Sequence, residues 1–173
     1  MDAGFCKIVT WQELQQLRPH NLKISPIAVV PQRDRRGRII LDLSFPVRRP
    51  EKAGRRRKMG PVMAPSVNET TVKLSPQTAV KEIGHVLTRV LHFMSSTPAD
   101  QQIYFSKVDL SDGFWRMIVQ PSQRWNFCYV MPDPPGSPIR IVIPSALQMG
   151  WTESPAYFGT ATKTGRDIIQ WLI

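Results

Sequence analysis

Two carboxylates in the segment SKVDLSDGFWRMIV are the first candidates for chemistry in this sequence. Asp109 and Asp112 follow an apolar run that is typical of a strand, and a glycine and two aromatic residues come next. A carboxylate at the end of a strand can project into a cleft, and Mg²⁺ takes one or two such carboxylates together with substrate phosphates. The same residues could instead form an ordinary acidic turn, in which Asp112 and Gly113 make the bend. Taken alone, the segment favours the ordinary turn.

A second segment, SALQMGWTESPAYF, places a glycine in a loop directly before a helix. Gly150 and Trp151 precede Ser154 and Pro155, and proline is common at the first position of a helix. A glycine here lets the backbone approach a ligand closely, and the helix start offers N–H groups to an anion. Taken alone, a plain capped helix is the better interpretation.

Positive charge is concentrated in one part of the chain. The net charge is +10, and the stretch from Arg33 to Lys58 contains eleven Lys and Arg against three acidic residues. Such a local field indicates a polyanionic partner, and arginine forks match phosphate oxygens well. A solvated basic loop, or a nuclear-localisation run at GRRRK, remains an alternative.

The elements that must position these residues can be predicted from periodicity and turn signals. Thr10 and Glu13 have the spacing of a capping box, which predicts a helix over 10–18 that Pro19 ends. Apolar residues recurring at three and four predict an amphipathic helix over 76–95, and another from Ser154 to the chain end. The other predictions are a hairpin from strands in 23–31 and 38–43 with a turn at 32–37, a long loop over 46–68, strands at 103–110 and 115–119, and a hairpin from strands at 125–131 and 139–143.

Composition indicates a folded protein without a disulfide framework. Of the 173 residues 42% are hydrophobic and 21% are charged, which is ordinary for a globular domain. The two cysteines, Cys6 and Cys128, form no metal-binding motif. The first residues lack the pattern of a signal peptide, and no apolar run is long enough to span a bilayer. We therefore expect an intracellular protein, cytoplasmic or nuclear, with reduced thiols and no membrane partner.

Together, three segments resemble the reverse transcriptase domain of retrotransposon-like retroelements. RGRIILDLSFPV is similar to the fingers hairpin, KVDLSDGFWRMIV to motif A and LQMGWTESPAYF to motif B, in the family's order and over roughly 24–173. The resemblance implies an α+β polymerase fold, with a β-hairpin-rich fingers lobe and part of a palm that carries an incomplete split βαβ sheet. The implied divisions are an N-terminal flank at 1–19, fingers at 20–68 and 121–147, and palm at 69–120 and 148–173.

The resemblance also implies a role for individual residues. Asp109 would be the catalytic residue and a ligand of both Mg²⁺ ions, Asp112 and Gly113 would offer N–H groups to the triphosphate, and Phe114 would stack under the sugar. Gln148 lies one residue before the place where the family has its glutamine, and Met149 occupies that place. The remaining implied residues are Arg33, Arg38, Gln148, Met149 and Gly150 for the nucleotide, and Arg35, Arg36, Arg55, Arg56, Arg57, Lys58 and Trp151 for the nucleic acid.

The implied activity is template-directed DNA synthesis from dNTPs on an RNA or DNA template-primer. The family's motif C, a Tyr-x-Asp-Asp hairpin, does not occur in these 173 residues. We therefore expect a fragment of the domain, without thumb, RNase H and part of the palm, that is inactive alone. One alternative is a viral RNA-dependent RNA polymerase, but Phe114 stands where such enzymes usually have an aspartate that binds the ribose 2′-OH. Another is a non-catalytic, basic nucleic-acid-binding remnant.

Overall fold

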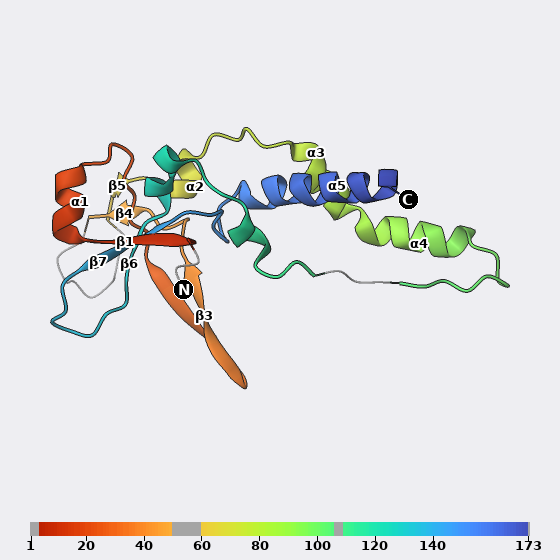
Figure 1. Ribbon diagram of the computed structural model, residues 1–173, viewed down its shortest axis with the longest axis horizontal. Helices are drawn as coiled ribbons and strands as arrows, with labels where there is room; N and C mark the ends of the chain where they lie inside the picture. The colour runs from red at the N-terminus through yellow and green to blue at the C-terminus, as the bar shows by residue number, and fades with distance from the viewer. Residues whose placement is uncertain (1–3, 50–59, 106–108, 173) are drawn as a thin grey trace. The chain divides into compact units, whose positions relative to one another are not determined.

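The computed structural model describes residues 4–49, 60–105 and 109–172, which fall into two compact units. Unit 1 comprises Met1–Val72 and Phe114–Ser154, and unit 2 comprises Lys73–Gly113 and Pro155–Ile173. Helices and small antiparallel sheets are interspersed along the chain (Figure 1), so the α+β fold class is confirmed. The division into fingers and palm stays a prediction, because two compact units do not reveal what either unit does.

The core of unit 1 is built on a three-stranded sheet in the order β1-β7-β6. The strands are β1 (Cys6–Thr10), β7 (Arg140–Pro144) and β6 (Tyr129–Val130), and both pairings are antiparallel. The sequence analysis placed β1 in a flank and missed it. The buried residues packed together here are Val9, Leu14, Cys128, Ile141 and Ile143. Burial raises the pKa of the Cys128 thiol to about 12, so this cysteine stays protonated near neutral pH.

Helix α1 (Trp11–Leu17) begins where the sequence predicts. The Thr10 hydroxyl accepts a hydrogen bond from the Glu13 backbone N–H, and the Glu13 carboxylate accepts one from the Thr10 backbone N–H. This reciprocal capping box satisfies two donors that a helix start leaves open. It also fixes the direction of the helix so that Leu14 enters the core.

The predicted basic hairpin is formed by β2 (Ile27–Gln32) and β3 (Arg35–Leu41), which pair antiparallel. Figure 1 shows it extending away from the three-stranded sheet of the same unit. The turn is shorter than predicted: only Arg33 and Asp34 form it, and Asp34 adopts a positive φ of 59°. Arg35 and Arg36 were predicted in the turn but belong to β3, because Arg35 pairs with Gln32 across a bulge.

The prediction of a long structureless loop over 46–68 was wrong for the described part. Strands β4 (Val47–Arg48) and β5 (Val62–Ala64) pair there, and α2 (Val67–Thr70) follows. A second capping box starts α2, in which Ser66 and Glu69 exchange the same two hydrogen bonds as Thr10 and Glu13. The sequence SVNE has the spacing of a capping box. It was not recognised because the preceding stretch is rich in Pro, Gly and Arg, which favoured a loop.

The strand predicted at 115–119 is replaced by a tight turn. Residues Gly113–Arg116 form the 3₁₀ helix η1, and only a single bridge, Ile118 to Ala146, has strand character. Hydrogen bonds of the i to i+3 type close the turn at Gly113 and at Met117. The hairpin predicted from 125–131 and 139–143 is confirmed by β6 and β7, but its first residues belong to the 3₁₀ helix η2 (Pro121–Phe127).

The described residues of unit 2 form three α-helices. The predicted helix over 76–95 is divided at His85 into α3 (Gln77–Gly84) and α4 (Val86–Ser96), because His85 leaves helical geometry, with φ −101° and ψ 9°. Helix α5 (Ser154–Leu172) confirms the predicted C-terminal helix. The strand predicted at 103–110 does not form at 103–105 or 109–110, where no other described strand pairs with the chain; its remainder, 106–108, lies outside the described residues.

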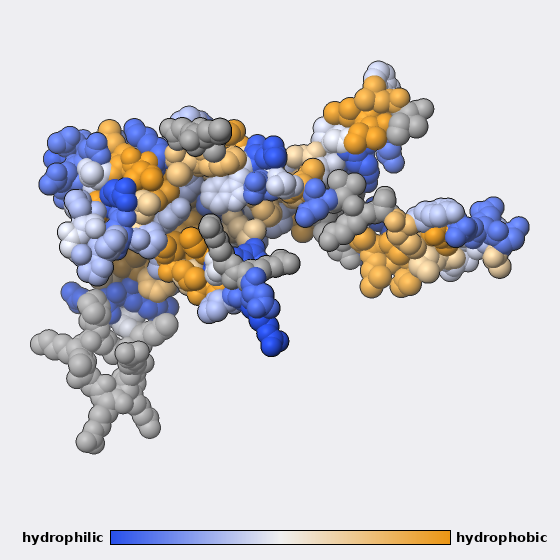
Figure 2. Space-filling view, turned by 60° about the horizontal axis from the view of Figure 1, so that its bottom comes forward, coloured by the Kyte–Doolittle hydropathy of each residue, from blue (hydrophilic) through white to orange (hydrophobic). Residues whose placement is uncertain are grey.

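Much apolar surface of unit 2 is exposed among the described residues. Leu87, Phe93 and Met94 of α4 and Ile169 and Trp171 of α5 are all exposed. Figure 2 shows apolar surface in orange beside hydrophilic surface in blue. Among the described residues, no helix has the length and apolar character that crossing a membrane requires.

Candidate functional site

The loop before α5 is the centre of the candidate site, and we call residues 148–152 the glycine loop. Gly150 has a φ of +100°, which L side chains rarely adopt. A Cβ built on Gly150 would lie 3.3 Å from the backbone oxygen of Leu41, the last residue of β3. Glycine therefore allows the loop to pass closely against the base of the hairpin.

Two residues that the sequence assigned to the nucleotide meet at this place. The guanidinium of Arg38, in β3, donates a hydrogen bond to the sulfur of Met149 in the glycine loop. Met149 is 52% exposed, so this contact lies at the surface. A thioether sulfur is a weak acceptor, and a stronger acceptor such as a phosphate oxygen can replace it at little cost.

Asn68 of α2 holds the glycine loop in position. Its side-chain amide donates to the Gly150 carbonyl oxygen at 3.0 Å and to the Ser44 hydroxyl at 2.8 Å. Its side-chain oxygen accepts from the Thr152 backbone N–H at 3.1 Å, and its own backbone N–H donates to the Leu43 carbonyl at 3.0 Å. One side chain thus joins α2, the segment after β3 and the glycine loop. The sequence analysis missed Asn68; the capping box that starts α2 was the available signal.

Buried contacts support the two ends of the glycine loop. Gln148 is only 4% exposed, and its amide donates to the Ala146 carbonyl oxygen at 2.8 Å. The Ser154 hydroxyl donates to the Gln148 carbonyl at 2.8 Å, which ties the loop to the start of α5. Gln148 was predicted to contact the nucleotide, yet the structure places its side chain inside unit 1.

Trp151 is also turned into unit 1. Its indole N–H donates to the Thr71 hydroxyl at 2.8 Å, and its ring meets the Phe127 ring edge-on with centroids 5.4 Å apart. The side chain is half-buried. An aromatic anchor and a buried amide thus hold the loop on both sides of Gly150.

Lys23 binds the backbone at the start of the short helix α2. The Lys23 ammonium donates to the carbonyl oxygens of Pro65, at 3.3 Å, and Ser66, at 3.1 Å. Burial lowers the pKa of Lys23, and the nearby Glu69 carboxylate acts in the opposite direction. Hydrogen bonds from Ser66 hold the pKa of Glu69 below its usual range. The position of Asn68 therefore depends on a charged Glu69 and on Lys23.

The other predicted basic residues lie between Arg33 and Lys58 in the sequence. Arg33 is exposed in the hairpin turn, and Arg35 and Arg36 lie in β3. Arg55, Arg56, Arg57 and Lys58 lie outside the described residues. Arg38 is thus a predicted phosphate-binding arginine that the described residues bring to the glycine loop.

The predicted metal ligand belongs to the other unit. Asp109 and Asp112 are exposed residues of unit 2, and Asp112 adopts a left-handed backbone with φ 56°. A Cβ on Gly113 would lie 2.6 Å from the ring of Phe158 in α5, so this glycine is required by packing within unit 2. Phe114 is half-buried in η1 and begins the second segment of unit 1. In the part of the chain that the structure describes, no three His, Cys, Asp or Glu residues are grouped to hold a metal ion.

Comparison with known proteins does not place this chain in a family. No model of a known protein family matches it, and no curated protein matches it. The function must therefore be argued from the residues and from the geometry of the glycine loop.

Proposed function

We propose that this chain is part of a reverse transcriptase, an enzyme that copies a nucleic-acid template into DNA from dNTPs. The observation that carries the proposal is the contact between Arg38 and Met149. The resemblance assigns these two residues independently to the incoming nucleotide, and they are 111 positions apart in the sequence. Their contact in one unit supports a shared ligand.

The chemistry of this place suits a triphosphate. The Arg38 guanidinium is always charged and forms forked hydrogen bonds with phosphate oxygens. A phosphate oxygen is a much stronger acceptor than the Met149 sulfur, so a triphosphate would displace the sulfur from Arg38. Asn68 and Trp151 would hold the glycine loop in place while the triphosphate binds. The space beside the loop would then be available for the base of the nucleotide and for the template.

Asp109 is the residue that we propose as the Mg²⁺ ligand in the complete domain. Magnesium would neutralise the charge that develops on the transferred phosphate and on the leaving pyrophosphate. Two-metal sites hold their ions about 3.5–4 Å apart and need carboxylates from more than one segment. Because no Tyr-x-Asp-Asp occurs in these 173 residues, we expect no DNA synthesis by this chain alone.

Primer extension on an RNA template tests the proposal. The chain is extended with the sequence encoded downstream, and single-nucleotide incorporation is measured with dNTP and with rNTP. Asp109→Asn should abolish synthesis, whereas Asp100→Asn, an exposed control in the same unit, should not. Phe114→Val should increase ribonucleotide use, because the ring that excludes the 2′-OH is lost. Robust synthesis by the 173-residue chain, or activity that persists in Asp109→Asn, would refute the proposed metal site.

A second candidate is a non-catalytic protein that binds nucleic acid through its charge. The net charge of +10 favours this function whether or not a nucleotide is turned over. Binding should then be tolerant of sequence and weaken steeply with salt, because bound phosphates release counterions. Changing Arg55, Arg56 and Arg57 to Ala should reduce the salt slope by up to about three. An unchanged slope would show that this run does not contact the nucleic acid.

A further inference from the structure

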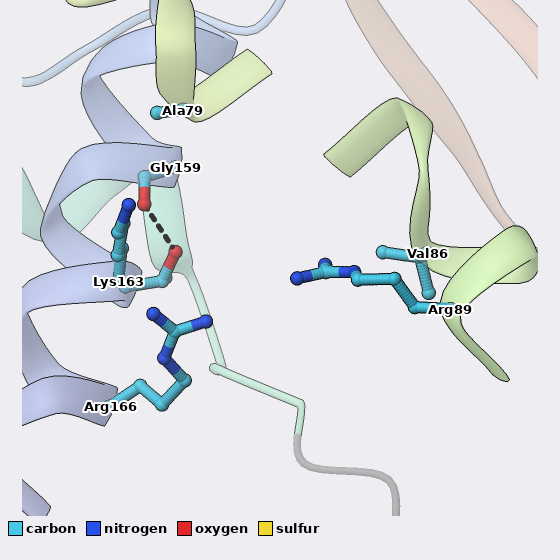
Figure 3. Close-up of a pocket in the computed structure, with 7 residues that line it drawn as sticks. Ala79, Val86, Arg89, Gly159, Lys163 and Arg166 are labelled. Carbon is cyan, nitrogen blue, oxygen red and sulfur yellow. Dashed lines mark hydrogen bonds between the residues drawn. The ribbon is translucent and has the colours of Figure 1, made fainter. Parts of the chain in front are cut away.

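A small cavity in unit 2 brings three positive side chains together. Its volume is about 160 Å³, and it opens between side chains of α3, α4 and α5 (Figure 3). The cations are Arg89 of α4 and Lys163 and Arg166 of α5, with Ala79 and Gly159 also in the lining. Figure 3 shows Arg89 pointing from its helix toward the side chains of Lys163 and Arg166.

The lining is strongly biased in charge. Lys163 and Arg166 are three residues apart on α5, so they share one face of the helix. None of the described lining residues is acidic. Arg166 is paired with Asp167 at 2.7 Å, but both side chains are about half exposed. Exposed pairs of this kind contribute little, and a guanidinium has five N–H donors, so this pairing does not prevent Arg166 from binding an anion.

The one hydroxyl among these residues is already used by the helix. The Thr162 hydroxyl donates to the backbone oxygens of Gly159, at 3.0 Å, and Phe158, at 3.1 Å. Recognition at this cavity therefore falls on the three cations. A tetrahedral anion has several acceptor oxygens, so a single phosphate can accept hydrogen bonds from all three cations.

We propose that this cavity binds a phosphate group, either of a nucleic-acid backbone or of a free oligophosphate. It lies within unit 2, whereas Arg38 and the glycine loop lie in unit 1. The proposal does not depend on polymerase activity, because it needs neither Asp109 nor magnesium. Failure of one proposal can therefore be told from failure of the other.

Two ligands, measured without magnesium in the presence of EDTA, test the proposal. Sodium triphosphate is titrated by calorimetry, and a fluorescein-labelled single-stranded DNA oligonucleotide by fluorescence anisotropy. The test variant is Arg89→Gln with Lys163→Gln, and the matched control is Lys73→Gln with Lys81→Gln. The control removes the same charge from the same unit but from residues outside the cavity lining. Charged hydrogen bonds contribute about 1.5–3 kcal/mol, so the test variant should weaken binding at least about tenfold more than the control.

The two ligands distinguish the source of the phosphate. If the test variant binds triphosphate more weakly, the cavity is a site for a free oligophosphate. If only its affinity for the oligonucleotide falls, the cavity is a site for the nucleic-acid backbone. Equal effects of test and control variants on both ligands would overturn the proposal, because long-range charge alone would then explain binding. If the double variant does not fold, Arg166→Gln decides in its place. Lys163→Arg, which keeps the charge, should retain binding.

Discussion

The guanidinium of Arg38 lies against the sulfur of Met149, and this contact joins the basic hairpin to the glycine loop within unit 1. Directly beside it, the backbone oxygen of Leu41 would lie 3.3 Å from a Cβ on Gly150. The hairpin and the loop are therefore close through both side chain and backbone. We therefore expect a ligand that binds Arg38 to contact the glycine loop as well.

Replacement of Arg38 by glutamine should weaken dNTP binding. Charged hydrogen bonds are worth about 1.5–3 kcal/mol, so the dissociation constant should rise about ten- to a hundredfold. Arg49→Gln is a suitable control, because it removes the same charge from an exposed residue of the same unit. Fluorescent dNTP titration with magnesium measures both. Equal losses in the two variants would show that Arg38 acts only through net charge.

Asn68→Asp should destabilise unit 1 although it barely changes the shape of the side chain. The carboxylate can still accept from the Thr152 N–H, but it cannot donate to Ser44 or to Gly150. A typical hydrogen bond contributes about 0.5–1.5 kcal/mol, and denaturant unfolding should show a loss of about that size for each of the two bonds that are lost. Asn126→Asp is the control, since the described hydrogen bonds of that amide stay within η2, where it donates to Gln123. A loss no larger than that of the control would refute the bridging role of Asn68.

Two glycines of unit 2 should respond to alanine in opposite directions. A Cβ at Gly113 meets the Phe158 ring at 2.6 Å, so Gly113→Ala should destabilise the protein by about 1–3 kcal/mol. Gly165 lies inside α5 with nothing within 4 Å of its Cβ position, so Gly165→Ala should stabilise it by about 0.5–1 kcal/mol. Thermal unfolding of both variants measures the difference. A stabilising Gly113→Ala would contradict the described packing of Gly113 on Phe158.

Short sequence patterns correctly predicted the helices and hairpins whose formation depends on neighbouring residues. The capping box of Thr10 and Glu13 predicted α1, and alternation with turn residues predicted the two larger hairpins. At 103–105 and 109–110 the predicted strand has no described partner strand, and the run at 115–119 forms only the single bridge from Ile118 to Ala146. A run of β-forming residues becomes a strand only when another strand completes its hydrogen bonds. The sequence of a short segment does not show whether such a partner strand is present.

The candidate site shows the same limit. The resemblance to reverse transcriptase motifs singled out Gly150 and Arg38, but the burial of Gln148 and the hydrogen bonds of Asn68 depend on segments distant in the sequence. The division of the helix at His85 follows a glycine, which is a poor helix former. Periodicity continues across such a break, so it predicted one helix rather than two.

The support that α2 gives to the glycine loop should be lost in acid. Hydrogen bonds from Ser66 lower the pKa of Glu69 in the folded state. Stability from this group is present above the ordinary pKa of a glutamate and declines as the pH falls through the lowered value. The stability difference between wild type and Glu69→Gln should therefore be constant near neutral pH and shrink in acid. Denaturant unfolding at several pH values measures it. A difference that grows in acid would contradict the capping role of Glu69.

The pairing of β1 with β7 has a consequence for synthesis of the protein on the ribosome. Strand β1 leaves the ribosome before its partner β7, the central strand of the sheet, which is made only after the whole first part of unit 2. Closing so long a loop is slow, because the entropy cost comes before the contacts that offset it. During translation, Val9 and Leu14 cannot be buried in this core until Ile141 and Ile143 have been synthesised. The nascent β1 and α1 will therefore expose apolar side chains to chaperones until β7 has emerged.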